Sequence, residues 1–112
     1  MLKNQTKNKI LSKKVKICNS LFSKAKGLMF SKRKTLIFIF KTEKIVPLHM
    51  FFVFYPIDVL FLNKNKEVIE IKRDLRPFTF YSPKQKSKCI IELPAGTIND
   101  TGTSIGDTIR FK

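Results

Sequence analysis

The pattern of hydrophobic and polar positions changes about a third of the way along the chain. From Thr35 onward apolar runs dominate, and residues 36–40 and 57–62 are almost continuously apolar, which is typical of strands covered on both faces. Residues 67–72 alternate apolar and charged side chains and predict a half-buried strand. The polar residues 63–66 between two such runs predict a hairpin turn.

The same pattern predicts further strands on both sides of this hairpin. We expect strands at residues 45–54, 78–81 and 88–93, and an edge strand at 107–112. Pro94-Ala95-Gly96 opens a short turn or helical piece. Six to eight short strands with one or two short helices predict a mainly β (α+β) fold, a small barrel or sandwich.

The N-terminal part follows a different pattern. Residues 1–13 are mostly polar and basic, so we expect a flexible arm. Residues 14–112 then form one β-rich domain, in which residues 14–17 alternate as a strand and residues 20–28 have the apolar spacing of a short helix. The length of 112 residues fits a single domain.

Charge adds a second contrast between the two parts. The chain carries 23 Lys and Arg against 8 Asp and Glu, a net charge of +15. Residues 1–34 hold ten Lys, one Arg and no acid (+11), whereas residues 35–112 hold twelve bases and eight acids (+4). The basic stretch favours contact with a polyanion such as RNA or DNA, or is a solvated face. Its candidate polyanion-binding residues are Lys24, Lys26, Lys32, Arg33 and Lys34.

Several features bear on the compartment. The basic N-terminus lacks the apolar run of a secretory signal, so we expect a cytoplasmic protein with Cys18 and Cys89 reduced. Residues 45–62 are apolar enough to resemble a membrane span, but Pro47 and Pro56 would interrupt a helix. We therefore expect strands there and no membrane span.

Five phrases occur in a recognisable order: Lys26–Phe30, His49–Leu62, Ser82–Lys84, Ile91–Ile98 and Ile105–Asp107. In this order they resemble the family called domain of unknown function 192, especially its archaeal-type members. The resemblance spans about Val15 to Phe111. It implies a compact β-rich fold and assigns no reaction. Many bacterial members carry Trp-Met-Lys-Asn-Thr where this chain has the residues from His49 to Val53.

The residues that carry this resemblance also supply a candidate cleft. It would be bordered by chemically capable or backbone-shaping residues: Gly27, Met29, His49, Met50, Asp58, Glu92, Pro94 and Gly96. Replacing His49 by Ala or Asp58 by Asn is then expected to remove binding and to leave folding nearly intact. Each residue also has a structural explanation. His49 would be a hydrogen-bonded core residue rather than a general base, and the two carboxylates would be paired rather than catalytic.

No catalytic or cofactor signature accompanies the cleft. The sequence contains neither Gly-rich nucleotide-binding motif, nor a Gly-x-Ser-x-Gly motif, nor metal-type cysteine spacing. We therefore expect no metal and no cofactor, and a ligand- or partner-binding module rather than an enzyme. The alternative is nonspecific nucleic-acid binding through the basic N-terminal third. Phe78, Phe80 or Tyr81 beside Arg73 and Arg76 would then stack on bases.

Overall fold

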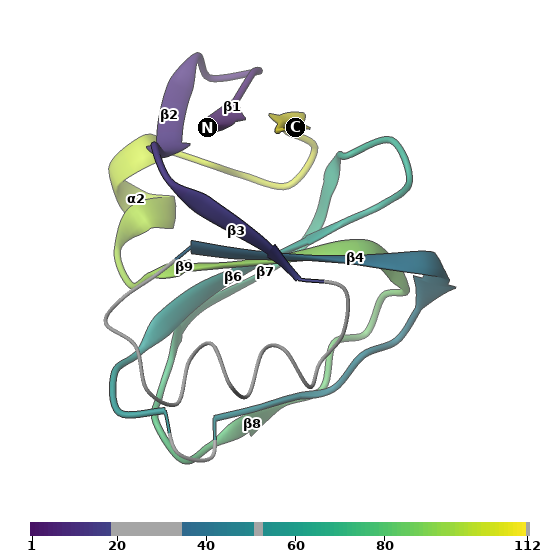
Figure 1. Cartoon of the computed structure of the whole chain (residues 1–112), viewed down its shortest axis with the longest axis vertical. Helices are drawn as coiled ribbons and strands as arrows, with labels where there is room; N and C mark the ends of the chain where they lie inside the picture. Colours follow the sequence, from purple (N-terminus) through teal and green to yellow (C-terminus); the bar gives the residue numbers. More distant parts are fainter. Residues whose placement is uncertain (19–34, 51–52, 112) are drawn as a thin grey trace.

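The computed structural model describes residues 1–18, 35–50 and 53–111. Its centre is a five-stranded sheet in the order β3-β4-β9-β6-β7 (Figure 1). β3 is parallel to β4, and the other neighbours are antiparallel. The bounds of these strands are Val15–Cys18 (β3), Thr35–Lys44 (β4), Ile57–Leu62 (β6), Val68–Leu75 (β7) and Ser87–Pro94 (β9).

Two smaller sheets complete the fold. A three-stranded sheet has the order β10-β1-β2, and a two-stranded ribbon joins β5 to β8. The only helix in the described part of the chain is α2 (Thr97–Thr101). The short strands are Leu2–Asn4 (β1), Lys9–Ser12 (β2), Leu48–His49 (β5), Phe80–Tyr81 (β8) and Ile109–Arg110 (β10). The predicted mainly β class is confirmed, with the sheets stacked in open layers as in a sandwich.

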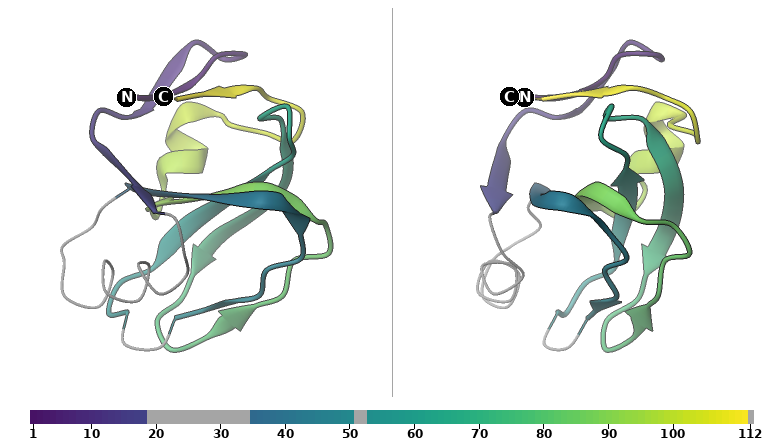
Figure 2. Two further views of the ribbon diagram at one scale, coloured as in Figure 1. Left: turned by 45° about the vertical axis from the view of Figure 1, so that its right-hand side comes forward. Right: turned by 90° about the vertical axis from the view of Figure 1, so that its right-hand side faces the viewer.

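The central sheet is covered on both faces (Figure 2). One face packs on β1, β2, β10 and α2 through a cluster that includes Leu2, Leu60 and Ile98. The other face packs on the β5–β8 ribbon and on residues just before β5, through a cluster that includes Phe38, Met50 and Phe61. Every residue of β6 is buried, as the continuous apolar runs predict for a central strand.

The expected N-terminal arm is wrong, because residues 1–13 form two strands of the fold. Leu2 is fully buried, and Asn4 is buried and donates to Thr103 and to Asp107. β1 also pairs with β10, so the two ends of the chain lie side by side (Figures 1 and 2). The alternation of Leu2, Lys3 and Asn4 is too short a pattern to reveal a strand that pairs with the adjacent β2 and with the distant β10.

In the described part of residues 45–54, where the pattern predicts one strand, only Leu48–His49 forms a strand. The peptide groups of Met50 then bond across to the turn before β8: Met50 N–H donates to Thr79 O, and Met50 O accepts from Phe78 N–H. Pro47 has no N–H to donate, which limits the ladder on its N-terminal side. The helix expected at 20–28 lies outside the described residues. No helix in the described ranges is long and apolar enough to cross a membrane.

Candidate functional site

Asp58 is a buried carboxylate that organises backbone. Its Oδ1 accepts from Asp74 N–H, and its Oδ2 accepts from the N–H groups of Gly96 and Ile98, all at 3.0 Å. The latter two N–H groups belong to the first turn of α2, where helices leave donors without internal partners. Asp58 therefore replaces the missing partners, as a capping side chain does.

Glu92, the other predicted carboxylate, lies on the opposite face of the sheet from Asp58. Across the β6–β9 ladder, Val59 stands opposite Glu92 and Asp58 opposite Leu93. Because neighbouring residues of a strand point to opposite faces, Asp58 faces the side of α2, and Glu92 faces the side of the ribbon. Glu92 is fully buried there. The two carboxylates do not share one cleft.

Gly96 donates its backbone N–H to Asp58, and Pro94 stands opposite Ile57 on the neighbouring strand. Gly96 has φ 97° at the start of α2, a left-handed conformation that favours glycine. This explains why Pro94-Ala95-Gly96 precedes the helix. Of the remaining predicted cleft residues, Gly27 and Met29 lie outside the described residues, and Met50 is fully buried.

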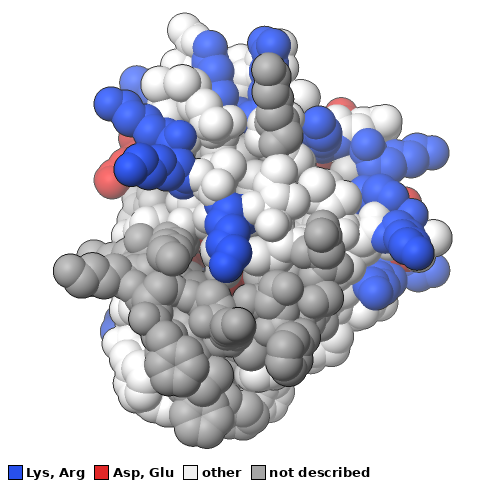
Figure 3. All heavy atoms as spheres, in the orientation of Figure 1, with Lys and Arg blue, Asp and Glu red and all other residues white. Residues whose placement is uncertain are grey.

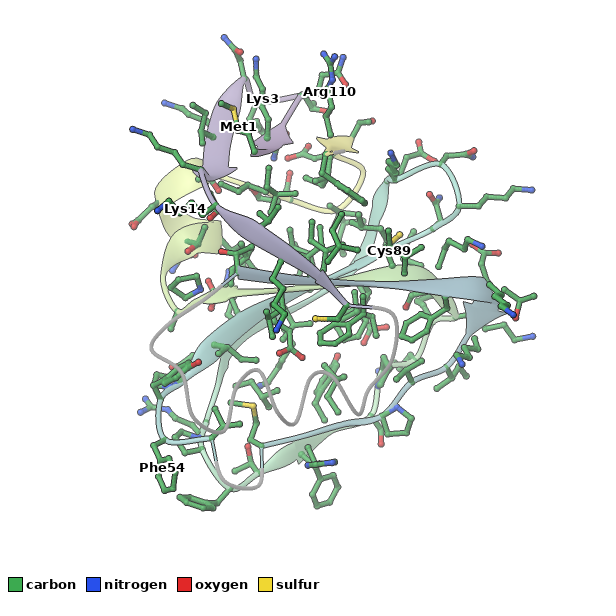
Figure 4. All side chains as sticks on the ribbon, viewed as in Figure 1. Met1, Lys3, Lys14, Phe54, Cys89 and Arg110 are labelled. Atoms are coloured by element: carbon green, nitrogen blue, oxygen red, sulfur yellow. The ribbon has the colours of Figure 1, made fainter. Side chains whose placement is uncertain are left out.

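His49 lies on the surface, where it joins exposed aromatic residues. It is the cross-strand partner of Phe80, which is 74% exposed. Phe54 and Phe78 lie near the same ribbon, with ring centroids 5.5 Å apart and planes at 75°, an edge-to-face pair. We call His49, Phe54, Phe78 and Phe80 the aromatic end. Figure 4 shows Phe54 projecting from the lower end of the molecule.

Phe78 holds an unfavourable backbone conformation at this surface. Its φ is 62°, in the left-handed region that bulky side chains rarely occupy. Hydrogen bonds at both ends fix it there, from Phe78 N–H to Met50 O and from the Thr79 hydroxyl to Arg76 O. Its side chain is 55% exposed and so recovers little of this cost by burial. Sequence reasoning named Phe78 and Phe80 as exposed rings, but it missed Phe54, which it placed in a strand.

The cysteines are poor nucleophiles. Burial raises the pKa of the Cys18 thiol; the charge of Lys16 lowers it and that of Glu92 raises it. Burial also raises the pKa of the Cys89 thiol, and this effect outweighs the lowering by the charges of Lys66 and Lys88. The two thiols belong to clusters on opposite faces of the central sheet. The described residues contain no group of three or more His, Cys, Asp or Glu that could hold a metal ion.

Basic side chains cover a different part of the surface. In Figure 3 they gather over the region of β1, β2 and β10 and along one lateral edge of the same face. Residues 1–18 contribute six lysines and no acid. The five predicted polyanion-binding residues from Lys24 to Lys34 lie outside the described part of the chain.

Together these observations define a small β-rich domain with a five-stranded core sheet, an aromatic end and a basic end. The chain belongs to domain of unknown function 192, the family described as "Uncharacterized ACR", whose sequence pattern matches residues 2–111. It is 42% identical to a UPF0127 protein of Thermococcus sibiricus, over all of this chain and 75% of that protein. It is 37% identical to a UPF0127 protein of Pyrococcus furiosus, over 96% of this chain and 95% of that protein. The predicted archaeal-type resemblance is confirmed.

Two crystal structures have the same fold. One is a Sinorhizobium meliloti protein described as a "putative transcription regulator"; its TM-score is 0.79 at 22% identity, over 86% of this chain and 79% of that one. The other is a protein of unknown function from Novosphingobium aromaticivorans, with a TM-score of 0.78 at 19% identity, over 87% and 74%. At these identities the likeness concerns the fold alone.

Proposed function

We propose that this protein is a binding module, not an enzyme, and that its aromatic end holds a peptide segment of a protein partner. The strained and exposed Phe78 carries the proposal. A left-handed backbone at a bulky residue costs about 1–3 kcal/mol and persists where the surroundings enforce it, typically at functional positions. Nothing in the burial of Phe78 offsets that cost within the monomer.

The neighbouring residues extend this surface. Phe54 and Phe80 are 70% and 74% exposed, so three large rings face solvent on one end of the molecule. Exposed aromatic residues grouped in this way mark interaction sites, and aromatic anchors contribute most of the energy in many interfaces. Each ring contributes roughly 1.5–3 kcal/mol when it becomes fully buried.

Charge favours an acidic partner. The chain carries +15, and Arg76 beside the aromatic end, although it pairs with Asp74, has a side chain that is 70% exposed. A second copy of this chain would be repelled by the same field, whereas acidic residues flanking an apolar anchor would be attracted. The proposed ligand is therefore a peptide with one or two large apolar side chains and acidic neighbours.

A peptide-display selection tests this proposal. A random library is selected on the wild-type protein, and the affinities of enriched peptides are measured by fluorescence anisotropy. The contact variant is Phe54→Ser/Phe78→Asn/Phe80→Ser, and the control is Ile105→Ser, which removes a side chain that is 66% exposed elsewhere. We expect acidic peptides with apolar anchors that bind the contact variant at least about tenfold more weakly, a loss of about 1.4 kcal/mol. Enriched peptides that bind both variants equally, or no enrichment at all, would contradict the proposal.

Phe78→Asn alone separates binding from folding. Asn tolerates the left-handed region, so its substitution should leave stability unchanged or raise it by about 1 kcal/mol while it weakens peptide binding. Urea denaturation of the variant measures the change in its free energy of unfolding. A clear loss of stability would mean that Phe78 is retained for the fold and not for a ligand.

Nonspecific nucleic-acid binding is a second candidate, favoured by the six lysines of residues 1–18. Deleting residues 1–13 cannot test it, because β1 and β2 belong to the fold. Instead, Lys9, Lys13, Lys14 and Lys16 are exposed and can be changed to Gln. The fourfold variant should flatten the dependence of oligonucleotide affinity on salt. Absence of retention on a polyanion column at about 0.1 M salt, where the Debye length is about 10 Å, excludes this candidate.

A further inference from the structure

Two cations stand side by side on the small sheet. Lys3 of β1 is the cross-strand partner of Arg110 of β10. Their side chains point away from the body at the upper end of the molecule (Figure 4). With Met1 and Phe111 they line an open hollow of about 280 Å³. Like charges directly opposite each other destabilise a strand pair, so this arrangement has a cost.

Phe111, which lines the hollow, also carries a cation from another element. Lys66, in the turn between β6 and β7, holds its Nζ 4.5 Å from the centre of the Phe111 ring. Its carbonyl accepts from Ile109 N–H, which ties the turn to β10. The backbone of Lys66 is left-handed, with φ 61°, a conformation that Gly or Asn adopts more readily. A lysine thus occupies a position whose backbone conformation suits other residues better.

The carboxylates near these cations are engaged elsewhere. Asp107 accepts hydrogen bonds from Asn4, Lys7 and Ser104, and Lys7 forms its ion pair. Glu67 accepts from the side chain of Asn63. Among the described residues, the ion pairs are Lys7–Asp107 and Arg76–Asp74, and neither includes Lys3, Lys66 or Arg110.

We propose that Lys3, Lys66 and Arg110 form a binding site for a phosphate group. A guanidinium presents a planar fork of donors that matches two phosphate oxygens, and each ammonium adds a point charge. A phosphate monoester carries about −1.5 to −2 charges and three acceptor oxygens, so it can engage all three cations. A carboxylate offers one charge and two oxygens, and would leave one cation unsatisfied. This site lies apart from the aromatic end and does not depend on the function proposed there.

Amide chemical shifts from NMR titration of the intact protein test the site. The first probe is inorganic phosphate, and the second is a short oligothymidylate, both at about 20 mM salt, where charges are weakly screened. We expect saturable shifts at Lys3, Lys66 and Arg110. Saturation by inorganic phosphate indicates a free phosphate or monoester, and saturation by the oligonucleotide alone indicates a phosphodiester backbone.

Matched variants decide whether the site is specific. Lys3→Gln/Arg110→Gln removes two charges from the hollow, and Lys84→Gln/Lys86→Gln removes two exposed charges from the β8–β9 connection. We expect the first to weaken binding at least about tenfold, the second to weaken it less than about twofold, and Arg110→Lys to lie between them. Lys66→Asn should weaken binding without loss of thermal stability. Equal weakening by the two double variants, or no saturable shift with either probe, would overturn the proposal.

Discussion

Asp58 and Phe78 show opposite relations between a side chain and its backbone. The Asp58 carboxylate satisfies three N–H groups that come from two separate segments, so the local fold depends on it. Phe78 instead occupies a backbone conformation that is unfavourable for it and leaves its ring largely in solvent. The first pattern identifies a residue needed for stability, and the second identifies a residue that stability alone does not explain.

Replacing Asp58 should therefore unfold the protein more easily. Asp58→Ala leaves three N–H groups without their acceptor; the Ile98 hydrogen bond is buried and the other two are partly buried. A buried donor left without a partner costs about 1–3 kcal/mol, so we expect a loss of at least about 1–3 kcal/mol. Urea denaturation measures the free energy of unfolding. The control is Asp100→Asn, an exposed position in the first turn of α2, which should cost less than about 1 kcal/mol. A small loss for Asp58→Ala would restore the expectation that Asp58 serves binding.

Asp107 makes stability depend on pH. Burial alone would raise the pKa of this carboxyl. Hydrogen bonds from Asn4, Lys7 and Ser104, together with the charge of Lys7, more than offset this and hold the pKa below its usual value. A carboxylate whose pKa is lower in the folded state stabilises the protein above its unfolded pKa of about 3.9, and this stabilisation is lost as the pH falls through the folded pKa.

The pH dependence can be measured against Asp107→Asn. At pH 7 the variant should be less stable than the wild type by roughly 1–3 kcal/mol, the cost of weakening a charged hydrogen-bond network. In acid the wild-type carboxylate becomes protonated, so the difference between the two proteins should narrow. Denaturation at pH 7 and at about pH 3 gives both values. A difference that stays constant over this range would show that Asp107 does not titrate with folding.

At the scale of the element, the N-terminal hairpin has an unexpected role. Its strands contain mostly polar and basic residues, yet Leu2 and Leu11 enter the cluster that covers the central sheet. The buried Asn4 connects it to Thr103 and Asp107 on the other side of the small sheet. The hairpin therefore closes the core at one end while its outer surface presents lysines.

The hairpin should contribute measurably to stability. Leu2→Ala removes a fully buried side chain, and such truncations cost about 2–5 kcal/mol. Ile10→Ala on β2 is the control, since Ile10 is 48% exposed and should cost less than about 1 kcal/mol. Thermal or urea unfolding compares the two variants. If both cost equally little, the N-terminal residues act as the loose arm that their composition suggests.

The sequence predicts the long central strands well and the short peripheral ones poorly. Runs such as residues 57–62 are buried on both faces and need no partner to be recognised. The turn at 63–66 is equally readable, because the Asn63 side chain accepts from Asn65 and Glu67 N–H groups within the loop. By contrast, β10 is held as a strand by β1, which lies at the opposite end of the chain.

The candidate site, like the fold, could be predicted only in part from the sequence. The sequence names Asp58 and Gly96 as candidate residues, but their contact across 38 positions and the opposite facing of Asp58 and Glu92 depend on how the strands pair. A one-residue shift in the register of either strand would turn its carboxylate to the other face of the sheet. The aromatic end also escapes sequence reasoning, because exposure of Phe54 depends on where the strand before it ends. Local pattern therefore predicts elements, whereas the site depends on how they pair.

At the scale of the whole molecule, charge opposes compactness. A net charge of +15 on 112 residues produces mutual repulsion that the folded state concentrates. Residues 1–18 add six positive charges to an upper surface that also carries Arg110. The protein should therefore be more stable when these charges are screened.

Added salt should raise the melting temperature. Between about 0.02 and 0.2 M sodium chloride the Debye length falls below about 10 Å, which weakens repulsion between surface cations. Calorimetry at constant pH measures the shift. Sodium phosphate at the same ionic strength should raise the melting temperature further if the hollow beside Arg110 binds phosphate. A melting temperature that is unchanged or lower in salt would show that local ion pairs dominate over the net charge.

The pairing of β1 with β10 also sets the order of events during synthesis. Asn4 and Asp107, which share a hydrogen bond, are separated by 103 positions. Contacts between such distant residues are slow to form, and a growing chain folds only what has already been made. The residues of β1 must therefore wait until β10 has been made before they can pair with it. Until then the apolar face that Leu2 covers remains open, so a segment made before the central sheet is completed after it.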